Sequence, residues 1–118
     1  MLSLKNSLAV LRKTNALLDG HFVLSSGLHS PSYVQCAKLL SFPNKSEKFT
    51  KSLAFKIKKT FKNIDLILSP AMGGIIIGYE IGRVLKKETI FCERVGGNFK
   101  LRRGFNIEKG SRVLIIED

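Results

Sequence analysis

The stretch LILSPAMGGIIIGYEIG, residues 66–82, joins an apolar run, a glycine turn and the start of a helical pattern. Leu66–Leu68 is typical of a short buried strand, and Ile75–Leu85 has the apolar spacing of a helix. Gly73 and Gly74 allow a sharp turn and a close approach of the backbone to a ligand. The helix N-terminus directs amide N–H groups and partial positive charge at the same point. The stretch therefore predicts either a phosphate-binding turn or an ordinary strand–helix connection that needs glycine.

The same stretch also limits the kind of nucleotide site that can be present. It lacks GxxxxGK[ST] and GxGxxG, so neither a nucleoside triphosphate loop nor a dinucleotide fingerprint is supported. Gly78 and Gly82, farther along the helix, are predicted to be positions of close packing.

Two further strands are expected downstream, over Thr89–Cys92 and Arg112–Ile116. Strand, helix and strand in succession predict an α/β fold with a mostly parallel sheet flanked by helices. The last strand, in VLIIED (residues 113–118), is so apolar that we expect it to be buried on both faces. Glu117 and Asp118 at its carboxyl end suit sugar hydroxyls, directly or through hydrated Mg²⁺. A strand that simply ends in solvated acids is the alternative.

A basic, glycine-bearing segment, ERVGGNFKLRRGFNIEKG, lies between these two strands at residues 93–110. A mobile loop of this kind can close its cations over a polyphosphate. The alternative is a solvated β-hairpin with a basic tip. The cations of interest are Arg94, Lys100, Arg102 and Arg103.

The N-terminal part begins with an amphipathic helix, predicted over residues 3–18, with Ser3 as its cap and Asp19-Gly20 as its end. Short strands are expected over residues 21–24 and 33–36, with a turn-rich loop, SSGLHSPS, between them.

That loop holds a second candidate binding segment. The hydroxyls of Ser25 and Ser26 and the amide of Gly27 can hydrogen-bond a small polar ligand, although a capped turn is equally consistent with them. His21 and His29 are eight residues apart, a spacing that does not favour a metal site. We expect both histidines to be structural or solvated.

A second helix is predicted to open at Pro43-Asn44, with Asn44 and Glu47 as a capping pair. Its apolar stripe is predicted to be Phe49, Leu53, Ile57 and Phe61. The lysines outside this stripe are Lys45, Lys48, Lys51, Lys56, Lys58, Lys59 and Lys62. Only Phe55 stands among them, and stacking on single strands needs several aromatics. We expect a solvated helix face rather than a nucleic-acid groove.

Length and composition set the outer limits. With 118 residues, 44% of them hydrophobic and 25% charged, the chain is predicted to be one globular domain. The net charge of +11 favours anionic partners. No apolar run approaches the length of a membrane span. Cys36 and Cys92 are far apart and lack metal-ligand spacing, so we expect reduced thiols in a cytoplasmic protein.

Taken together, four stretches resemble the orotate phosphoribosyltransferase family: LLDGHFVLSSGLHSPSYVQCAKLL, LSPAMGGIIIGYEIG, IFCERVGGNFKLRRGF and GSRVLIIED. The resemblance implies a type I phosphoribosyltransferase fold over residues 1–118. In that fold, residues 1–42 form the N-terminal helix and part of a small hood, and residues 43–118 form the core.

The resemblance also implies an activity. Enzymes of this family transfer phosphoribosyl from 5-phosphoribosyl 1-diphosphate to orotate, which gives orotidine 5′-monophosphate and diphosphate in pyrimidine (UMP) biosynthesis. Mg²⁺ is carried by the sugar diphosphate rather than by the protein directly. A homodimer is implied, in which the mobile loop of one subunit closes the site of the other.

Site residues follow position by position from the resemblance. Glu117 and Asp118 match the acids that face the ribose hydroxyls, and the pyrophosphate loop is matched by Ala71, Met72, Gly73 and Gly74. Arg94, Lys100, Arg102 and Arg103 match the mobile loop and its flank; of these, Lys100, Arg102 and Arg103 are the candidate catalytic cations. Ser25, Ser26, Gly27 and Tyr33 match the wall of the orotate pocket.

The sequence also departs from the family pattern. Gly73 and Ser25 stand where some members have lysine, and the basic segment has no histidine. The Thr- and Gly-rich run that wraps the ribose 5-phosphate is absent after Asp118. We therefore expect a C-terminally incomplete fold with an open sheet edge and little or no activity of its own. The alternatives are a non-catalytic module that binds a nucleotide or RNA, and a purine phosphoribosyltransferase.

Overall fold

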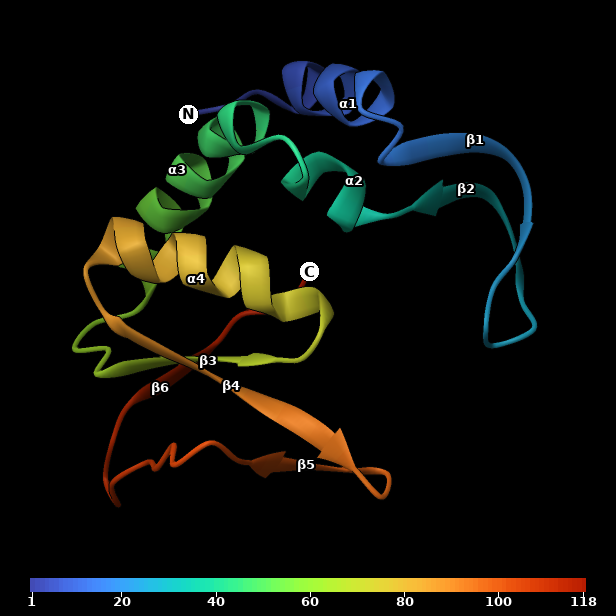
Figure 1. The fold of residues 1–118 in the computed structure, drawn as a ribbon. Coiled ribbons are helices and arrows are strands. Elements are labelled where there is room, and N and C mark those ends of the chain that lie inside the picture. The colour runs from blue at the N-terminus through green and yellow to red at the C-terminus, as the bar shows by residue number, and fades with distance from the viewer. The chain divides into compact units, whose positions relative to one another are not determined.

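The computed structural model describes residues 1–118 (Figure 1). Its helices are five to eighteen residues long, and its strands are short. The elements are α1 (Leu4–Lys13), β1 (Leu17–Val23), β2 (His29–Val34), α2 (Cys36–Leu40), α3 (Pro43–Thr60), β3 (Leu66–Pro70), α4 (Gly73–Leu85), β4 (Glu88–Val95), β5 (Asn98–Leu101) and β6 (Val113–Ile115). No helix has the length and apolar character needed to cross a membrane.

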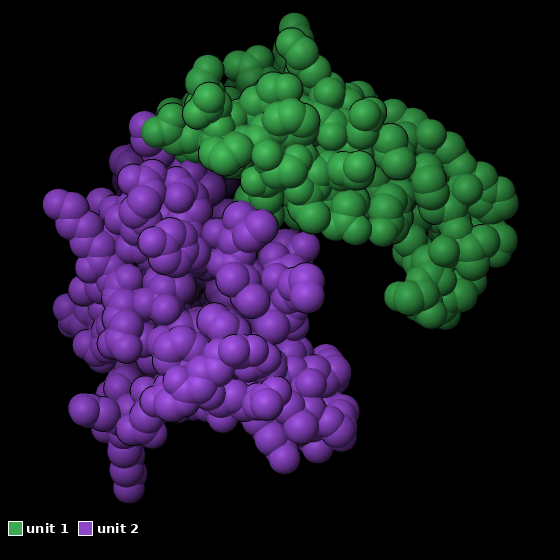
Figure 2. Space-filling view, viewed as in Figure 1, with its two compact units in different colours: residues 1–49 green, residues 50–118 purple.

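The chain divides into two compact units, residues 1–49 and 50–118 (Figure 2). The division falls inside α3. The sequence-based boundary between residues 42 and 43 lies instead where α3 begins.

In the first unit, α1 starts as predicted and ends early. The Ser3 hydroxyl accepts a hydrogen bond from the Asn6 amide at 3.2 Å, so Ser3 is the N-cap. The helix ends at Lys13 rather than residue 18. The Thr14 hydroxyl donates to carbonyls of the last turn, and Asn15 adopts φ +58°, a left-handed conformation that asparagine tolerates. The apolar residues that follow belong to β1.

Strands β1 and β2 form an antiparallel hairpin that is longer than predicted. Leu17 pairs with Val34 and Val23 with His29, with an irregularity between Asp19 and Phe22. Part of the predicted loop is therefore strand, and Cys36 begins α2 instead of ending a strand. Cross-strand partners stabilise β1 and β2, and a local sequence pattern does not reveal such partners.

Helix α3 begins at Pro43, the first-turn position that proline favours. The Phe42 carbonyl accepts from the amides of Lys45 and Ser46, so Phe42 precedes the helix and the predicted Asn44–Glu47 capping pair is wrong.

The predicted apolar stripe of α3 is also wrong in most positions. The buried residues are Ser46, Thr50, Ala54 and Ile57. Of the predicted stripe only Ile57 is buried, whereas Leu53 and Phe61 are exposed. The covered face carries small and polar side chains, which hydrophobicity does not mark, and Phe61 lies beyond the end of α3 at Thr60.

The second unit contains a four-stranded sheet in the order β5-β4-β3-β6. Strand β3 is parallel to β4 and to β6, while β4 and β5 form an antiparallel hairpin. Helix α4 connects β3 to β4 and packs on both strands. The predicted α/β fold with a β–α–β core is confirmed.

Glycine makes the packing of α4 possible. A Cβ atom at Gly78 would collide with the buried side chain of Ser69, and one at Gly82 with the side chain of Thr89. Both residues are close-packing positions, as predicted.

Strand β6 lies at the edge of the sheet, with β3 as its one neighbour. Val113 and Leu114 are half-buried, and Ile115 is 67% exposed. The prediction of burial on both faces is wrong, because no other element covers the side chain of Ile115. The expected open sheet edge is confirmed.

Candidate functional site

The glycine turn and the two terminal acids meet at one end of the sheet. A Cβ atom added to Gly73 would lie 2.5 Å from Oδ1 of Asp118. One added to Gly74 would lie 3.1 Å from Oε1 of Glu117 and 3.0 Å from the Ile116 carbonyl oxygen. The carboxylates therefore rest against the turn, as expected for residues at the carboxyl ends of two parallel neighbours, and a side chain at either glycine would displace them.

The turn also presents a helix N-terminus to the same place. Helix α4 begins at Gly73, and its N-cap, Met72, makes no side-chain capping hydrogen bond. The first-turn N–H groups of such a helix can bind an anion. The Ala71 amide donates to the Cys92 carbonyl at 2.8 Å, which ties the start of the turn to β4. The result is a site with amide donors from one strand end and carboxylates from the next.

The first part of the basic segment is an ordered hairpin, the alternative that the sequence left open. Strands β4 and β5 pair Glu93 with Lys100 and Arg94 with Phe99 across a turn at Gly96-Gly97. The Arg94 guanidinium lies 4.4 Å from the centre of the Phe99 ring and donates to the Gly97 carbonyl at 3.0 Å. Arg94 is thus folded onto its own hairpin.

One residue that the sequence analysis did not single out binds two of the remaining three cations. Glu93 accepts two hydrogen bonds from Arg103, each 3.0 Å long, and lies 3.9 Å from Nη1 of Arg102. Hydrogen bonding to Arg103 lowers the pKa of Glu93, and the same bond raises the pKa of Arg103. The available signal was an acid at the start of a segment that is otherwise rich in cations, with Glu108 as the only other acid in it.

The predicted pocket segment of the first unit is a capped turn. The Gly27 amide donates to the Leu24 carbonyl at 2.8 Å, and the Ser26 hydroxyl accepts from the Leu28 amide at 3.3 Å. These groups are engaged within the turn, whereas Ser25 is exposed. Tyr33 stacks on Phe22 with ring centres 5.6 Å apart. A role for this segment in binding remains a prediction.

The histidines contact each other, which their separation in sequence did not suggest. His21 Nε2 and His29 Nδ1 are 2.6 Å apart across the hairpin, and both residues are exposed. No group of three or more His, Cys, Asp or Glu side chains is arranged to hold a metal ion.

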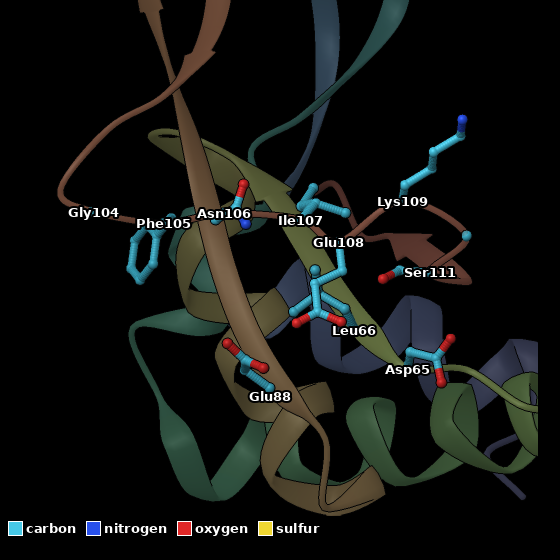
Figure 3. A pocket seen from close by; sticks show the side chains of 11 residues that line it. Asp65, Leu66, Glu88, Gly104, Phe105, Asn106, Ile107, Glu108, Lys109 and Ser111 are labelled. Atoms are coloured by element: carbon cyan, nitrogen blue, oxygen red, sulfur yellow. The ribbon is translucent and has the colours of Figure 1, made fainter.

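A separate depression of about 700 Å³ lies near Leu66 and Glu88, the first residues of β3 and β4 (Figure 3). Residues 104–111 and Asp65 complete its lining. Because Gly73 and Gly74 follow the carboxyl end of β3, this depression is at the other end of the strands. None of the predicted site residues lines it.

Comparison with known sequences shows related proteins at about 50% identity. The chain is 50% identical over 112 residues to orotate phosphoribosyltransferase of Erythrobacter litoralis and 52% identical over 112 residues to that of Sphingopyxis alaskensis. Each alignment covers 94% of this chain, and 58% and 57% of the respective relatives. The chain thus spans just over half the length of these curated relatives. No protein-family model matches it.

Solved structures show the same fold at lower sequence identity. Orotate phosphoribosyltransferase of Aeropyrum pernix matches 93% of this chain and 63% of its own, with a TM-score of 0.69 and 23% identity. UMP synthase of Leishmania donovani gives a TM-score of 0.75 at 22% identity, with 91% and 23% covered. Adenine phosphoribosyltransferase of Trypanosoma brucei gives 0.65 at 16% identity, with 100% and 57% covered. The fold is that of type I phosphoribosyltransferases.

Proposed function

Over 94% of its length the chain is homologous to orotate phosphoribosyltransferases, and we propose that it carries the sugar-diphosphate part of such an active site. The observation that carries the proposal is the contact of Glu117 and Asp118 with the turn at Gly73-Gly74. This contact brings acceptors for sugar hydroxyls next to donors for a diphosphate. The reaction would transfer phosphoribosyl from 5-phosphoribosyl 1-diphosphate to orotate, giving orotidine 5′-monophosphate and diphosphate for pyrimidine biosynthesis.

The chemistry needs charge stabilisation rather than a protein nucleophile. As diphosphate departs, C1 of the ribose becomes cation-like and negative charge accumulates on the leaving oxygens. The N-terminus of α4, in the turn formed by Ala71, Met72, Gly73 and Gly74, suits the diphosphate. Glu117 and Asp118 suit the ribose hydroxyls and would orient the sugar.

Mg²⁺ fits this arrangement as part of the substrate. Carboxylate oxygens are ligands that Mg²⁺ prefers, and the two acids that follow β6, Glu117 and Asp118, adjoin the turn. Glu117 and Asp118 would therefore meet the hydrated ion of the sugar diphosphate. Bound in this way, Mg²⁺ would offset the charge of the leaving group.

The cations of the β4–β5 hairpin and its C-terminal flank would complete the diphosphate site. Lys100, Arg102 and Arg103 are candidates to stabilise the leaving group, and Arg94 to contact the substrate. Exclusion of water by this segment would protect the activated sugar from hydrolysis. In the first unit, Ser25, Ser26, Gly27 and Tyr33 would form part of the wall for orotate. A cytoplasmic homodimer, in which partner subunits complete each other's sites, is part of the proposal.

Calorimetric titration of the chain with 5-phosphoribosyl 1-diphosphate and Mg²⁺ tests the proposal. We expect binding that weakens about tenfold or more in Asp118→Asn and Glu117→Gln, since each loses an acceptor charge near the sugar. Glu108→Gln, which removes an exposed acid elsewhere, is the matched control. Equal affinities for all four proteins would contradict the proposal.

A purine phosphoribosyltransferase is the second candidate, favoured by the adenine phosphoribosyltransferase that shares the fold. Adding orotate or adenine to the complex with the sugar diphosphate separates the two. Enhancement of binding by orotate alone supports the first candidate, and enhancement by adenine alone supports the second. Turnover assays with orotate then ask whether these 118 residues are active by themselves; we expect little or none.

A further inference from the structure

The two arginines assigned to the leaving group are already occupied by a carboxylate. Glu93 bonds both Nε and Nη2 of Arg103 at 3.0 Å, and its Oε1 is 3.9 Å from Arg102. The Glu93 side chain is 18% exposed, whereas the two arginines are each more than half exposed. The acid is thus the fixed member of the cluster, and the guanidinium groups come to it.

Aromatic contacts hold the same arrangement from other directions. The Arg103 guanidinium lies 5.7 Å from the centre of the Phe91 ring, and Phe105 meets that ring edge-on at 5.4 Å. Hydrogen bonding to Arg103 lowers the pKa of Glu93, so its carboxylate is ionised at neutral pH. The cluster therefore combines a two-pronged ion pair of Glu93 and Arg103 with a ring contact, and Arg102 adds a second, longer ion pair.

The backbone of Glu93 follows a residue that contacts the candidate site. Pro70, the last residue of β3, pairs with Cys92, and the Cys92 carbonyl accepts the Ala71 amide. Glu93 follows directly after Cys92. The residue that binds both arginines is therefore one position along β4 from the contact between β4 and the start of the glycine turn.

We propose that Glu93 competes with diphosphate for Arg102 and Arg103. In the free protein Glu93 binds both arginines, and diphosphate replaces it when the ligand binds. The proposal rests on the proposed function of the two arginines. A guanidinium binds carboxylate and phosphate in the same two-pronged geometry, so one anion can replace the other. Glu93 is accordingly a positioning residue that sets how readily the basic segment engages its ligand.

Calorimetric titration with inorganic pyrophosphate and Mg²⁺ provides the test. We expect Glu93→Gln to bind pyrophosphate about three- to tenfold more tightly than the parent chain, because the arginines are released from a charged partner. Glu108→Gln lowers the negative charge by the same amount on the same segment. We expect that control to match the parent chain, which separates competition at Glu93 from a general charge effect.

A double-substitution cycle locates the effect. In an Arg103→Ala background, Glu93→Gln should no longer tighten binding. Weaker or unchanged binding in Glu93→Gln alone overturns the proposal, since a carboxylate that oriented the arginines productively would act in that direction. If Arg102→Ala and Arg103→Ala bind pyrophosphate as well as the parent chain, the assignment of these arginines in the proposed function fails instead.

The parent chain offers a readout that survives even if a Glu93 variant does not fold. The Arg103 Nε–H resonance, observed by NMR, reports its bond to Glu93 in the free protein. Saturating pyrophosphate should shift this resonance while the Glu93 carboxyl resonance moves toward that of a free carboxylate. Displacement of neither resonance at saturation overturns the proposal.

Discussion

Two glycines of the second unit, Gly73 and Gly78, exclude a side chain for different reasons. At Gly78 a Cβ atom would meet the buried Ser69 side chain, which has no room to move. At Gly73 it would meet the carboxylate of Asp118, which is exposed and can turn away. Gly78 therefore bears on stability, and Gly73 bears on the site.

Gly78→Ala is expected to destabilise the second unit by about 1–2 kcal/mol, because overpacking costs about 1–3 kcal/mol and the gain in helix propensity returns about 1 kcal/mol at most. Urea unfolding followed by circular dichroism measures the change. Ile76→Ala, on an exposed position of the same helix, serves as the control and should change the free energy of unfolding far less. An unchanged or raised midpoint in Gly78→Ala would contradict the packing described for α4.

Gly73→Ala is expected to leave the free energy of unfolding within about 0.5 kcal/mol of that of the parent chain. It should nevertheless weaken binding of 5-phosphoribosyl 1-diphosphate about tenfold, because the Asp118 carboxylate is pushed from the turn. Calorimetry and urea unfolding on the same sample check both halves. A loss of stability without loss of affinity would assign Gly73 to packing and remove it from the site.

The residues whose juxtaposition follows from the sequence have a local cause. Gly73 and Gly74 mark a turn, and Glu117 and Asp118 end an apolar strand, so parallel strand order brought them together in the prediction as in the structure. Glu93 was missed because its role depends on Arg103, ten residues away across a hairpin. His21 and His29 were treated as separate for the same reason.

Among the elements, the β4–β5 hairpin forms an ion pair with Arg103 whose strength depends on pH. Glu93 has a pKa below its ordinary value of 4.5, chiefly because Arg103 donates hydrogen bonds to it. A lowered pKa in the folded state means that the ion pair contributes fully above the unfolded pKa. Its contribution is lost as the pH falls through the folded pKa.

We expect the Glu93 carboxyl carbon, followed by NMR, to titrate with a midpoint below 4.5. In Arg103→Ala the midpoint should return toward 4.5, because the principal donor is gone. The hairpin contacts around Arg103 should persist from neutral pH to mildly acid pH and loosen below that range. Identical midpoints in the two proteins would show that the Glu93–Arg103 bond is absent in solution.

Helices and strands were predictable where the spacing of apolar residues matched the buried face of the element. β3, α4 and β4 read clearly because an apolar run, a glycine turn and an apolar helix follow one another. In α3 the buried positions include Ser46 and Thr50, so hydrophobicity did not mark the face that is covered. The boundary between α1 and β1 was mispredicted because the helix ends through the backbone conformation of Asn15, which composition describes poorly.

At the scale of the whole molecule, the open side of β6 is the feature with a physical liability. An edge strand presents unpaired N–H and C=O groups, and Ile115 adds an exposed apolar side chain. The net charge of +11 opposes association, but salt screens that repulsion over about 8–10 Å. Self-pairing through β6 should therefore increase with ionic strength.

Ile115→Lys is expected to reduce this self-association, because a charge on an edge strand disfavours pairing. Sedimentation or light scattering across a salt series measures it. Ile76→Lys adds the same charge at a similarly exposed position on α4 and should be much less effective. Equal effects of the two substitutions would point to net charge rather than the strand edge.

The nearness of Asp118 to Gly73 has a practical consequence. A fluorescent amino acid inserted directly after Asp118 would lie near the first turn of α4, and no residue of the glycine turn would be altered. Its emission would change when an anion entered that space. The molecule thus provides an attachment point for an optical sensor of its own occupancy.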